Sequence, residues 1–217
     1  MQMYNNKNNY EKQRKWSDDL IPQVIPLILN ALGLSPDIWW IVETTPEQDM
    51  TEAADLILTN GETEYMIALR LRKEKYMIKY PFDFTIRREY TQGYKTEYEK
   101  VLADKFADLM FYGFRVGGEV VRWVLLHMDA YRDEHWFDEE NQLWLPQDHI
   151  SFDIRENHDG RNNFIGYDIN SFKNPKLVIA HNAGYYDDVI TQYLPKPDGT
   201  KIPMYTLKKK EDRTDGN

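Results

Sequence analysis

The sequence predicts an α/β protein built around one mixed β-sheet. Strand-like patterns recur along the first 130 residues, a helix precedes them, and a helix-capping motif precedes the last of them. The composition, with 41% hydrophobic and 29% charged residues, is that of an ordinary globular protein. At 217 residues we expect one domain with an appendage rather than two fused enzymes.

The composition excludes several classes of site. The chain has no cysteine, which rules out a disulfide framework, thiolate zinc sites, iron–sulfur clusters and a cysteine nucleophile. The Asn-rich N-terminus has no apolar stretch typical of a signal peptide, and the longest apolar run, 20–34, is interrupted by Pro22 and Pro26 and is too short to cross a bilayer. We therefore expect a cytoplasmic protein with no membrane partner.

The charge is distributed unevenly. The formal net charge of −9 argues against tight, non-specific nucleic-acid binding over the whole surface. Residues 70–100, however, contain nine basic and five acidic side chains, a local net charge of about +4. A basic centre thus lies within an acidic frame.

The first elements follow from helix and strand patterns. Residues Asn9–Leu34 predict a helix in two pieces, entered at Pro22 or Pro26 and ended by Gly33. The aromatic and β-branched run Ile38–Glu43 predicts a strand, and Ala53–Thr59 a second one, ended by a hairpin signal at Asn60-Gly61.

The next two strands are predicted by alternation. In Glu64–Arg72, one face carries Tyr65, Ile67, Leu69 and Leu71, and the other face is largely charged. Phe82–Glu89 alternates in the same way, which predicts a half-buried strand of the same sheet.

A capping box predicts the second helix. In Thr96-Glu97-Tyr98-Glu99 the threonine hydroxyl can cap the helix while Glu99 reaches back, so a helix should run from Thr96 to Met110 and end at Tyr112-Gly113-Phe114. The apolar run Val120–Met128 predicts a central strand. Further on we expect a strand at Lys176–Ala180 and a short helix at Asp187–Leu194. The predicted organisation is a flexible N-terminus (1–8), a core (9–132), an extension packed on the core (133–194) and a loose tail (195–217).

Two resemblances follow from this order. The succession helix, three strands, extra strand, helix, strand, with Asp55 early in the second strand and a cationic third strand, resembles the restriction-endonuclease-like core of the PD-(D/E)xK nucleases. Residues 10–132 also resemble a group of uncharacterised phage-encoded proteins, which implies the host-cell cytoplasm or the virion as location. The motifs that carry this second resemblance are Ala54-Asp55-Leu56, Ile67–Arg72, Phe84–Arg87, Thr96-Glu97 with Lys100, and Phe111–Phe114.

The nuclease resemblance implies a metal-dependent site. Phosphodiester hydrolysis needs a divalent cation, here Mg²⁺ or Mn²⁺, held by carboxylates and usually assisted by a lysine. Asp55 suits the first ligand. Where the family has an acidic residue, any residue and lysine, this chain has Ala68-Leu69-Arg70, so the second acid is missing. Arg70 can act as a charge clamp but not as a general base.

Other carboxylates could replace the missing acid. We prefer Glu97, which starts the second helix three residues before Lys100, so that Asp55, Glu97 and Lys100 should converge with Arg70 at one end of the sheet. Asp83 and Glu64 lie on the polar faces of their strands and are further candidates. Ranked below them are Glu43, Glu47 and Asp49.

Basic residues predict contacts to DNA. Arg70, Arg72 and Arg87 share a parity on neighbouring strands, which suits phosphate contact, although they could simply protect an exposed sheet face. Arg88 and Lys95 extend the predicted DNA-binding set. The five histidines show no metal-ligand spacing. In Trp39-Trp40 both rings cannot face inward on a strand, so one covers a helix or a partner.

Two hypotheses about function remain open at this point. One is a metal-dependent phage nuclease or DNA-processing factor, favoured by Asp55, Glu97, Lys100 and the basic centre. The other is a catalytically inactive binding module on a nuclease fold, such as an anti-defence or virion-associated protein with a protein partner. It is favoured by the alanine at position 68 and the net acidity. The sequence predicts no particular oligomeric state.

Overall fold

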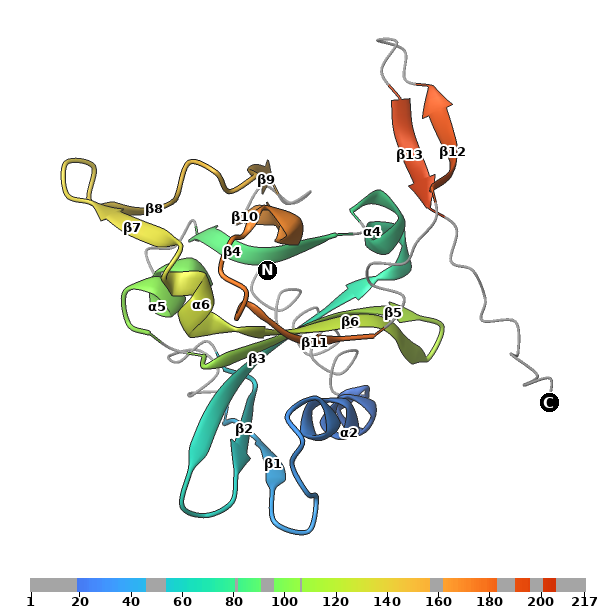
Figure 1. The fold of residues 1–217 in the computed structure, drawn as a ribbon, viewed down its shortest axis with the longest axis vertical. Coiled ribbons are helices and arrows are strands. Elements are labelled where there is room, and N and C mark those ends of the chain that lie inside the picture. The colour runs from blue at the N-terminus through green and yellow to red at the C-terminus, as the bar shows by residue number, and fades with distance from the viewer. Residues whose placement is uncertain are drawn as a thin grey trace, which may run out of the picture.

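The protein has a mixed α/β architecture, rich in strands and with few helices (Figure 1). The computed structural model describes residues 19–45, 54–80, 82–90, 96–105, 107–156, 162–182, 190–195 and 201–205. This architecture confirms the predicted fold class, an α/β protein with a mixed sheet, but the order of the strands differs from the prediction. In this part of the chain no helix has the length and apolar character needed to cross a membrane.

A six-stranded sheet, hereafter the main sheet, forms the centre. Among the strands that the structure describes, β3 and β5 pair in parallel and the other neighbours in this sheet are antiparallel. The predicted central position of the strand at 120–128 is confirmed, because β6 lies between β5 and β11. In spatial order the strands are β1 (Trp40–Glu43), β2 (Leu56–Thr59), β3 (Glu64–Lys73), β5 (Leu109–Val116), β6 (Glu119–His127) and β11 (Val178–His181).

Helix α2 (Ile21–Ala31) covers one face of the main sheet (Figure 1). Proline at its first turn needs no hydrogen-bonded amide, and Gly33 leaves the helix with a φ of +66° that suits glycine. Its buried side chains pack against strand residues such as Leu56 and Ile67. Residues 9–18 of the predicted helix lie outside the described residues.

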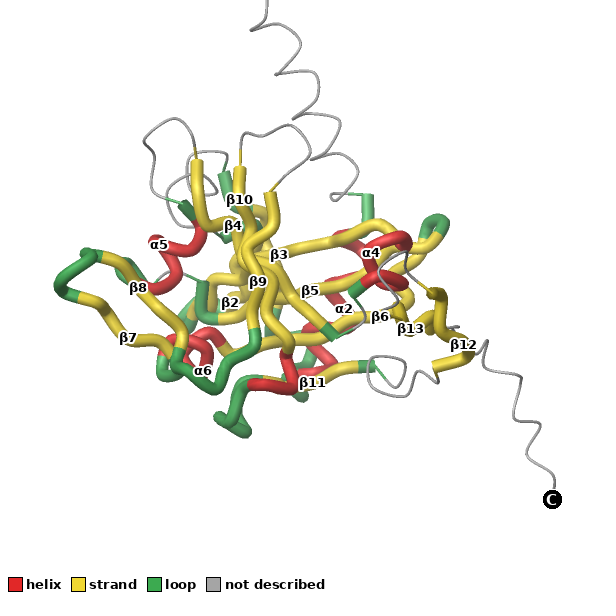
Figure 2. The backbone as a smooth tube through the Cα atoms, turned by 90° about the horizontal axis from the view of Figure 1, so that it is seen from above, coloured by secondary structure: helices red, strands yellow, loops and turns green. Residues whose placement is uncertain are grey.

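A second sheet covers the opposite face (Figure 2). It consists of β4 (Asp83–Tyr90), β10 (Asn162–Asp168) and β9 (Phe152–Glu156), in that order, all antiparallel. The prediction that Phe82–Glu89 belongs to the main sheet is wrong. Helix α4 (Glu74–Lys79) carries the chain off the main sheet after β3, and β5 takes the place beside β3.

The predicted half-burial of this strand is also wrong. Phe84 and Ile86 are buried in the hydrophobic core, as the alternation suggests, but Asp83 and Thr85 on the other parity are buried as well. The polar side of β4 therefore faces protein rather than solvent.

Helix α5 (Glu97–Leu102) begins at the predicted capping box. The amide of Glu99 donates to Thr96 Oγ1 at 3.2 Å, and the amide of Thr96 donates to Glu99 Oε2 at 2.7 Å. The helix ends eight residues earlier than predicted, because Lys105 and Ala107 both have a φ of +58°, and Leu109 already starts β5. Residues 111–114 are thus the middle of a buried strand rather than a helix end.

The C-terminal extension supplies strands to both sheets. It contributes β9 and β10 to the second sheet and β11 to the main sheet, close to the strand predicted at 176–180. The helix predicted at 187–194 is wrong where the chain is described, since residues from Ile190 form a strand. The remaining elements are α6 (Met128–Arg132), the hairpin β7 (His135–Asp138) and β8 (Leu143–Pro146), the 3-10 turn η1 (Ile169–Ser171), and the hairpin β12 (Ile190–Pro195) and β13 (Lys201–Tyr205).

Candidate nucleic-acid interface

Three arginines surround one phenylalanine between the sheets. Arg70 and Arg72 come from β3 and Arg87 from β4, and their Cζ atoms lie 5.8, 5.7 and 5.9 Å from the ring centroid of Phe164. Alternation in β3 directs Arg70 and Arg72 towards the second sheet, and the β4–β10 register sets Phe164 opposite Arg87. We call Arg70, Arg72 and Arg87 the arginine cluster. Each of its side chains is half-buried.

Glu97 orients this cluster from the first position of α5. Its Oε2 atom forms a close ion pair with Arg70 Nη2 and accepts the backbone amide of Arg87 at 3.1 Å. Burial alone would raise the pKa of Glu97, but the charges of Arg70 and Arg87 and the hydrogen bonds from both hold it below its ordinary value. Glu97 is therefore ionised at neutral pH and keeps Arg70 in place.

Asp55 lies on the same side of the main sheet. Its Oδ2 atom accepts the backbone amide of Leu69 at 2.7 Å, which ties the start of β2 to β3. Burial works against the charged form of Arg70, yet Glu97 and, more weakly, Asp55 raise the pKa of that guanidinium. Both carboxylates thus favour the charged form of Arg70.

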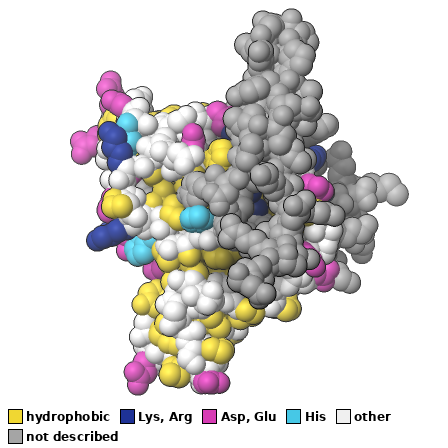
Figure 3. Space-filling model, turned by 45° about the vertical axis from the view of Figure 1, so that its right-hand side comes forward, with side chains coloured by type: hydrophobic (Ala, Val, Ile, Leu, Met, Phe, Trp, Pro, Cys, Tyr) yellow, Lys and Arg dark blue, Asp and Glu magenta, His cyan; other side chains and the backbone are white. Residues whose placement is uncertain are grey.

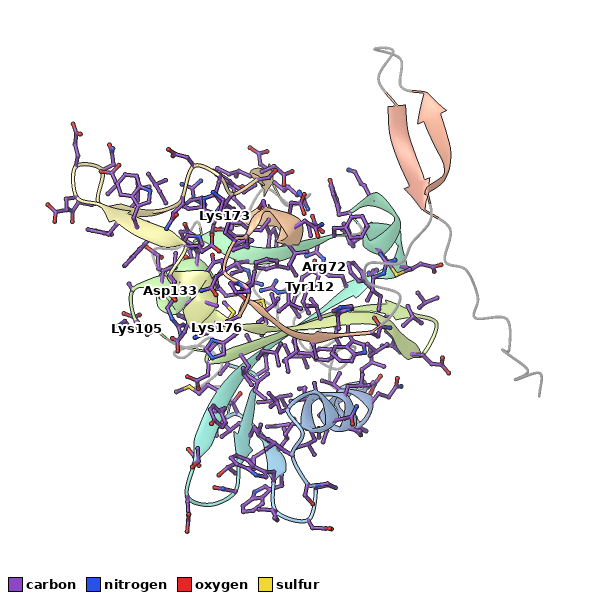
Figure 4. The ribbon with its side chains drawn as sticks, viewed as in Figure 1. Arg72, Lys105, Tyr112, Asp133, Lys173 and Lys176 are labelled. Carbon is purple, nitrogen blue, oxygen red and sulfur yellow. The ribbon has the colours of Figure 1, made fainter. Side chains whose placement is uncertain are left out.

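Arg72 joins the arginine cluster to two aromatic rings. Its guanidinium lies 4.3 Å from the ring centroid of Tyr76, and its Nη1 is 3.4 Å from Thr85 Oγ1. Tyr112 of β5 lies beside Arg72 on the inner face of the main sheet, where burial raises the pKa of its hydroxyl to about 12 (Figure 4). Cations packed on aromatic faces keep their charge while excluding water from one side.

A second ion pair closes the other end of β4. Asp83 pairs with Arg155 of β9, whose guanidinium also lies 3.7 Å from the ring centroid of Tyr80. Burial raises the pKa of Asp83 to about 6, although Arg155 and Arg72 oppose the shift. Gly166 makes room for Arg155, because a Cβ atom there would lie 2.5–2.8 Å from the guanidinium.

The other predicted residues take varied positions. Lys100 and Arg88 are half-buried on α5 and β4, and Glu97 is contacted by the side chain of Arg70 and the backbone amide of Arg87. Glu64 and Glu43 are exposed at strand ends. Lys95, Glu47 and Asp49 lie outside the described residues.

The predicted metal ligands are engaged by separate donors. Asp55 accepts a backbone amide, Glu97 pairs with Arg70, and Asp83 pairs with Arg155. Within the described ranges, no three His, Asp or Glu side chains are grouped so that they could hold a metal ion. As arranged here, the three carboxylates do not form a shared site for a divalent ion, and the Mg²⁺ or Mn²⁺ cofactor stays a prediction.

Two members of the site were not found by sequence reasoning. Phe164 and Arg155 lie in β10 and β9, in the C-terminal third that the resemblance does not cover. The alternation Phe152-Asp153-Ile154-Arg155 was the one available signal, and it indicates a strand without indicating its neighbours.

Comparison with protein-family models, with curated proteins and with solved structures found no match for this chain. The resemblance to PD-(D/E)xK nucleases and to phage-encoded proteins therefore stays a prediction, and the case for a function depends on the geometry of the site.

Proposed function

We propose that this chain is a DNA-binding module in which the arginine cluster contacts the phosphate backbone. One observation carries the proposal: three guanidinium groups from two different sheets meet around Phe164, and Glu97 holds one of them in a fixed orientation. Guanidinium groups bind phosphate oxygens through paired N–H donors, and an arginine already oriented loses less conformational freedom on binding.

The surrounding charge explains how such a site would behave. With a net charge of −9, most of the surface repels nucleic acid, so binding depends on the few arginines at the cluster. The three side chains of the cluster are half-buried, so each keeps some of its surface in contact with solvent. We therefore expect local, strongly salt-dependent binding to the backbone rather than coating of the protein by DNA.

A metal-dependent phosphodiesterase is the second candidate. It is favoured by two carboxylates that act on the same arginine, since Glu97 pairs with Arg70 and the charge of Asp55 raises the pKa of that guanidinium. In this candidate an ion would have to draw Glu97 away from Arg70. Where the nuclease family has its second acid, this chain has Ala68, which is buried in the core. The binding module is therefore the better-supported function.

Fluorescence anisotropy with single-stranded, double-stranded and branched oligonucleotides tests the proposal. We expect the logarithm of the association constant to fall linearly with the logarithm of the salt concentration. The slope of this line should be smaller by about one unit in Arg72→Ala and in Arg87→Ala. Lys176→Ala is the matched control, because this exposed lysine precedes β11 and is not part of the cluster. Thermal melts of each variant separate lost binding from lost folding.

Two results would decide against the binding module. Affinities that are the same in Arg72→Ala, Arg87→Ala and Lys176→Ala would show that the cluster does not bind DNA. Cleavage of any oligonucleotide with Mn²⁺ that disappears in Asp55→Asn would instead establish the phosphodiesterase.

A further inference from the structure

The strand β1 forms a free edge of the main sheet. In the part of the chain that is described, β1 pairs only with β2. An edge strand presents backbone N–H and C=O groups to which a further strand can bind, and natural edges are often protected by lysine or proline. The sequence of β1, Trp-Ile-Val-Glu, contains neither. As far as the chain is described, this edge is therefore open to strand addition.

The same strand exposes apolar side chains on one face. Trp40 lies opposite Thr59 and Val42 opposite Ile57, so Trp40 and Val42 point to the same side of the sheet. They are 49% and 45% exposed, and Ile38, two residues before Trp40, is 60% exposed. The opposite face is the one that packs against α2.

The two adjacent tryptophans thus have different surroundings. Trp39 is half-buried and stacks on Tyr65 with ring centroids 6.0 Å apart. Trp40 turns to the other face, where nearly half of its surface remains in solvent. Large exposed aromatic residues beside a free strand edge are typical of a protein-binding surface.

The charge around this edge identifies the kind of partner. Residues 34–66 contain no Lys, Arg or His, and the projecting end of the molecule shows hydrophobic and acidic side chains on the face seen in Figure 3. A second copy of this chain would bring the same negative charge to the contact, whereas a basic segment complements it. The acidic residues described at this end of the molecule are Asp37 in the turn before β1, Glu43 at the end of β1, and Glu62 and Glu64 at the β2–β3 hairpin.

We propose that the β1 edge binds an extended basic segment of a partner protein, which adds a strand to the main sheet. Apolar side chains at alternate positions of the segment pack on Trp40 and Val42, and its Lys or Arg residues lie near Glu43 and Asp37. This surface is separate from the arginine cluster and does not depend on the proposed DNA binding.

A labelled peptide, Lys-Val-Lys-Val-Arg-Val-Lys, serves as the probe in fluorescence anisotropy with the full chain. We expect binding that weakens at least about tenfold in Trp40→Ser, as for loss of an interface anchor. Trp136→Ser is the matched control, because Trp136 lies in β7 and is 47% exposed, close to the 49% of Trp40. A second variant, Val42→Lys, places an edge lysine at the site and should have the same effect as Trp40→Ser.

Control peptides separate strand addition from charge attraction. Replacing the central valine of the probe by proline keeps the charge but removes a backbone donor, and should also weaken binding about tenfold. Equal binding of the proline and valine peptides, or equal effects of Trp40→Ser and Trp136→Ser, would overturn the proposal. A dimer in sedimentation velocity that dissolves in Trp40→Ser would also overturn it, since a second copy would then be the occupant. DNA binding by Trp40→Ser should stay unchanged.

Discussion

Lowering the pH should destabilise this protein through His135. The imidazole is buried, and because the backbone oxygen of Tyr131 can only accept, Nδ1–H donates to it at 2.8 Å. Nε2 then accepts a hydrogen bond from the hydroxyl of Tyr167 at 3.0 Å. Burial lowers the pKa of His135 from 6.5 to about 4, so this ring is neutral in the folded protein.

The magnitude follows from the shift in pKa. Between pH 6.5 and about 4 the unfolded chain binds a proton at His135 that the folded protein does not, so stability decreases as the pH falls through this window. A shift of this size corresponds to about 3 kcal/mol at the acidic end, at 1.36 kcal/mol per pKa unit. Above the ordinary pKa of histidine the full stability is present.

Asp83 contributes a pH dependence of stability with the opposite sign, so it must be replaced before the effect of His135 can be measured alone. Because its folded pKa is raised to about 6, the folded protein holds the proton more tightly, and the stability that this contributes is lost as the pH rises from 3.8 through 6. The two effects partly cancel in the wild type. The His135 dependence should therefore be steeper in Asp83→Asn.

Urea unfolding followed by tryptophan fluorescence provides the assay, at pH values from about 4.5 to 7.5. We expect Asp83→Asn to lose stability towards acid, and the double variant Asp83→Asn/His135→Gln to lose much less, because glutamine does not titrate. Identical slopes in the single and double variants would show that His135 is not the group responsible.

Three further substitutions test the site and its supports. Glu97→Gln should lower the free energy of unfolding by about 3 kcal/mol or more, because it leaves the Arg70 charge without its buried partner. An unchanged urea midpoint would mean that the pair is not formed. Gly166→Ala should push Arg155 from Asp83 at a cost of about 2 kcal/mol, and should cost far less in an Arg155→Ala background. Glu99→Gln should weaken only the helix cap, by about 0.5 kcal/mol, with unchanged DNA binding.

The local features of the fold were the most predictable from sequence. The strands at β1, β2, β3 and β6 follow from alternation or apolar runs, and the start of α5 follows from its capping box. The strand β5 was missed, because its first two residues were assigned to the predicted helix and residues 112–114 to the end of that helix. Leu109–Phe114 is buried on both faces, and such a continuous apolar run shows no period of two.

Long-range partners were the least predictable. Nothing in residues 82–89 indicates that β4 would pair with β10, whose residues lie more than 70 positions later in the chain. Arg70, Arg72 and Arg87 do lie around Phe164, but they come from two different sheets rather than from the neighbouring strands on which the parity argument placed them. That argument could not place Phe164 among them or give Asp83 its partner Arg155, because both depend on that distant pairing.

The strand β3 connects two surfaces of opposite charge. Its first residue, Glu64, belongs to the acidic stretch at the β1 edge, and its later residues Arg70 and Arg72 belong to the arginine cluster. Eight residues of extended chain separate Glu64 from Arg72, which corresponds to roughly 26 Å. That distance exceeds the Debye length of about 8 Å at physiological ionic strength. The acidic edge is therefore screened from DNA at the cluster, so one rigid sheet can present a cationic site and an acidic docking edge without either cancelling the other.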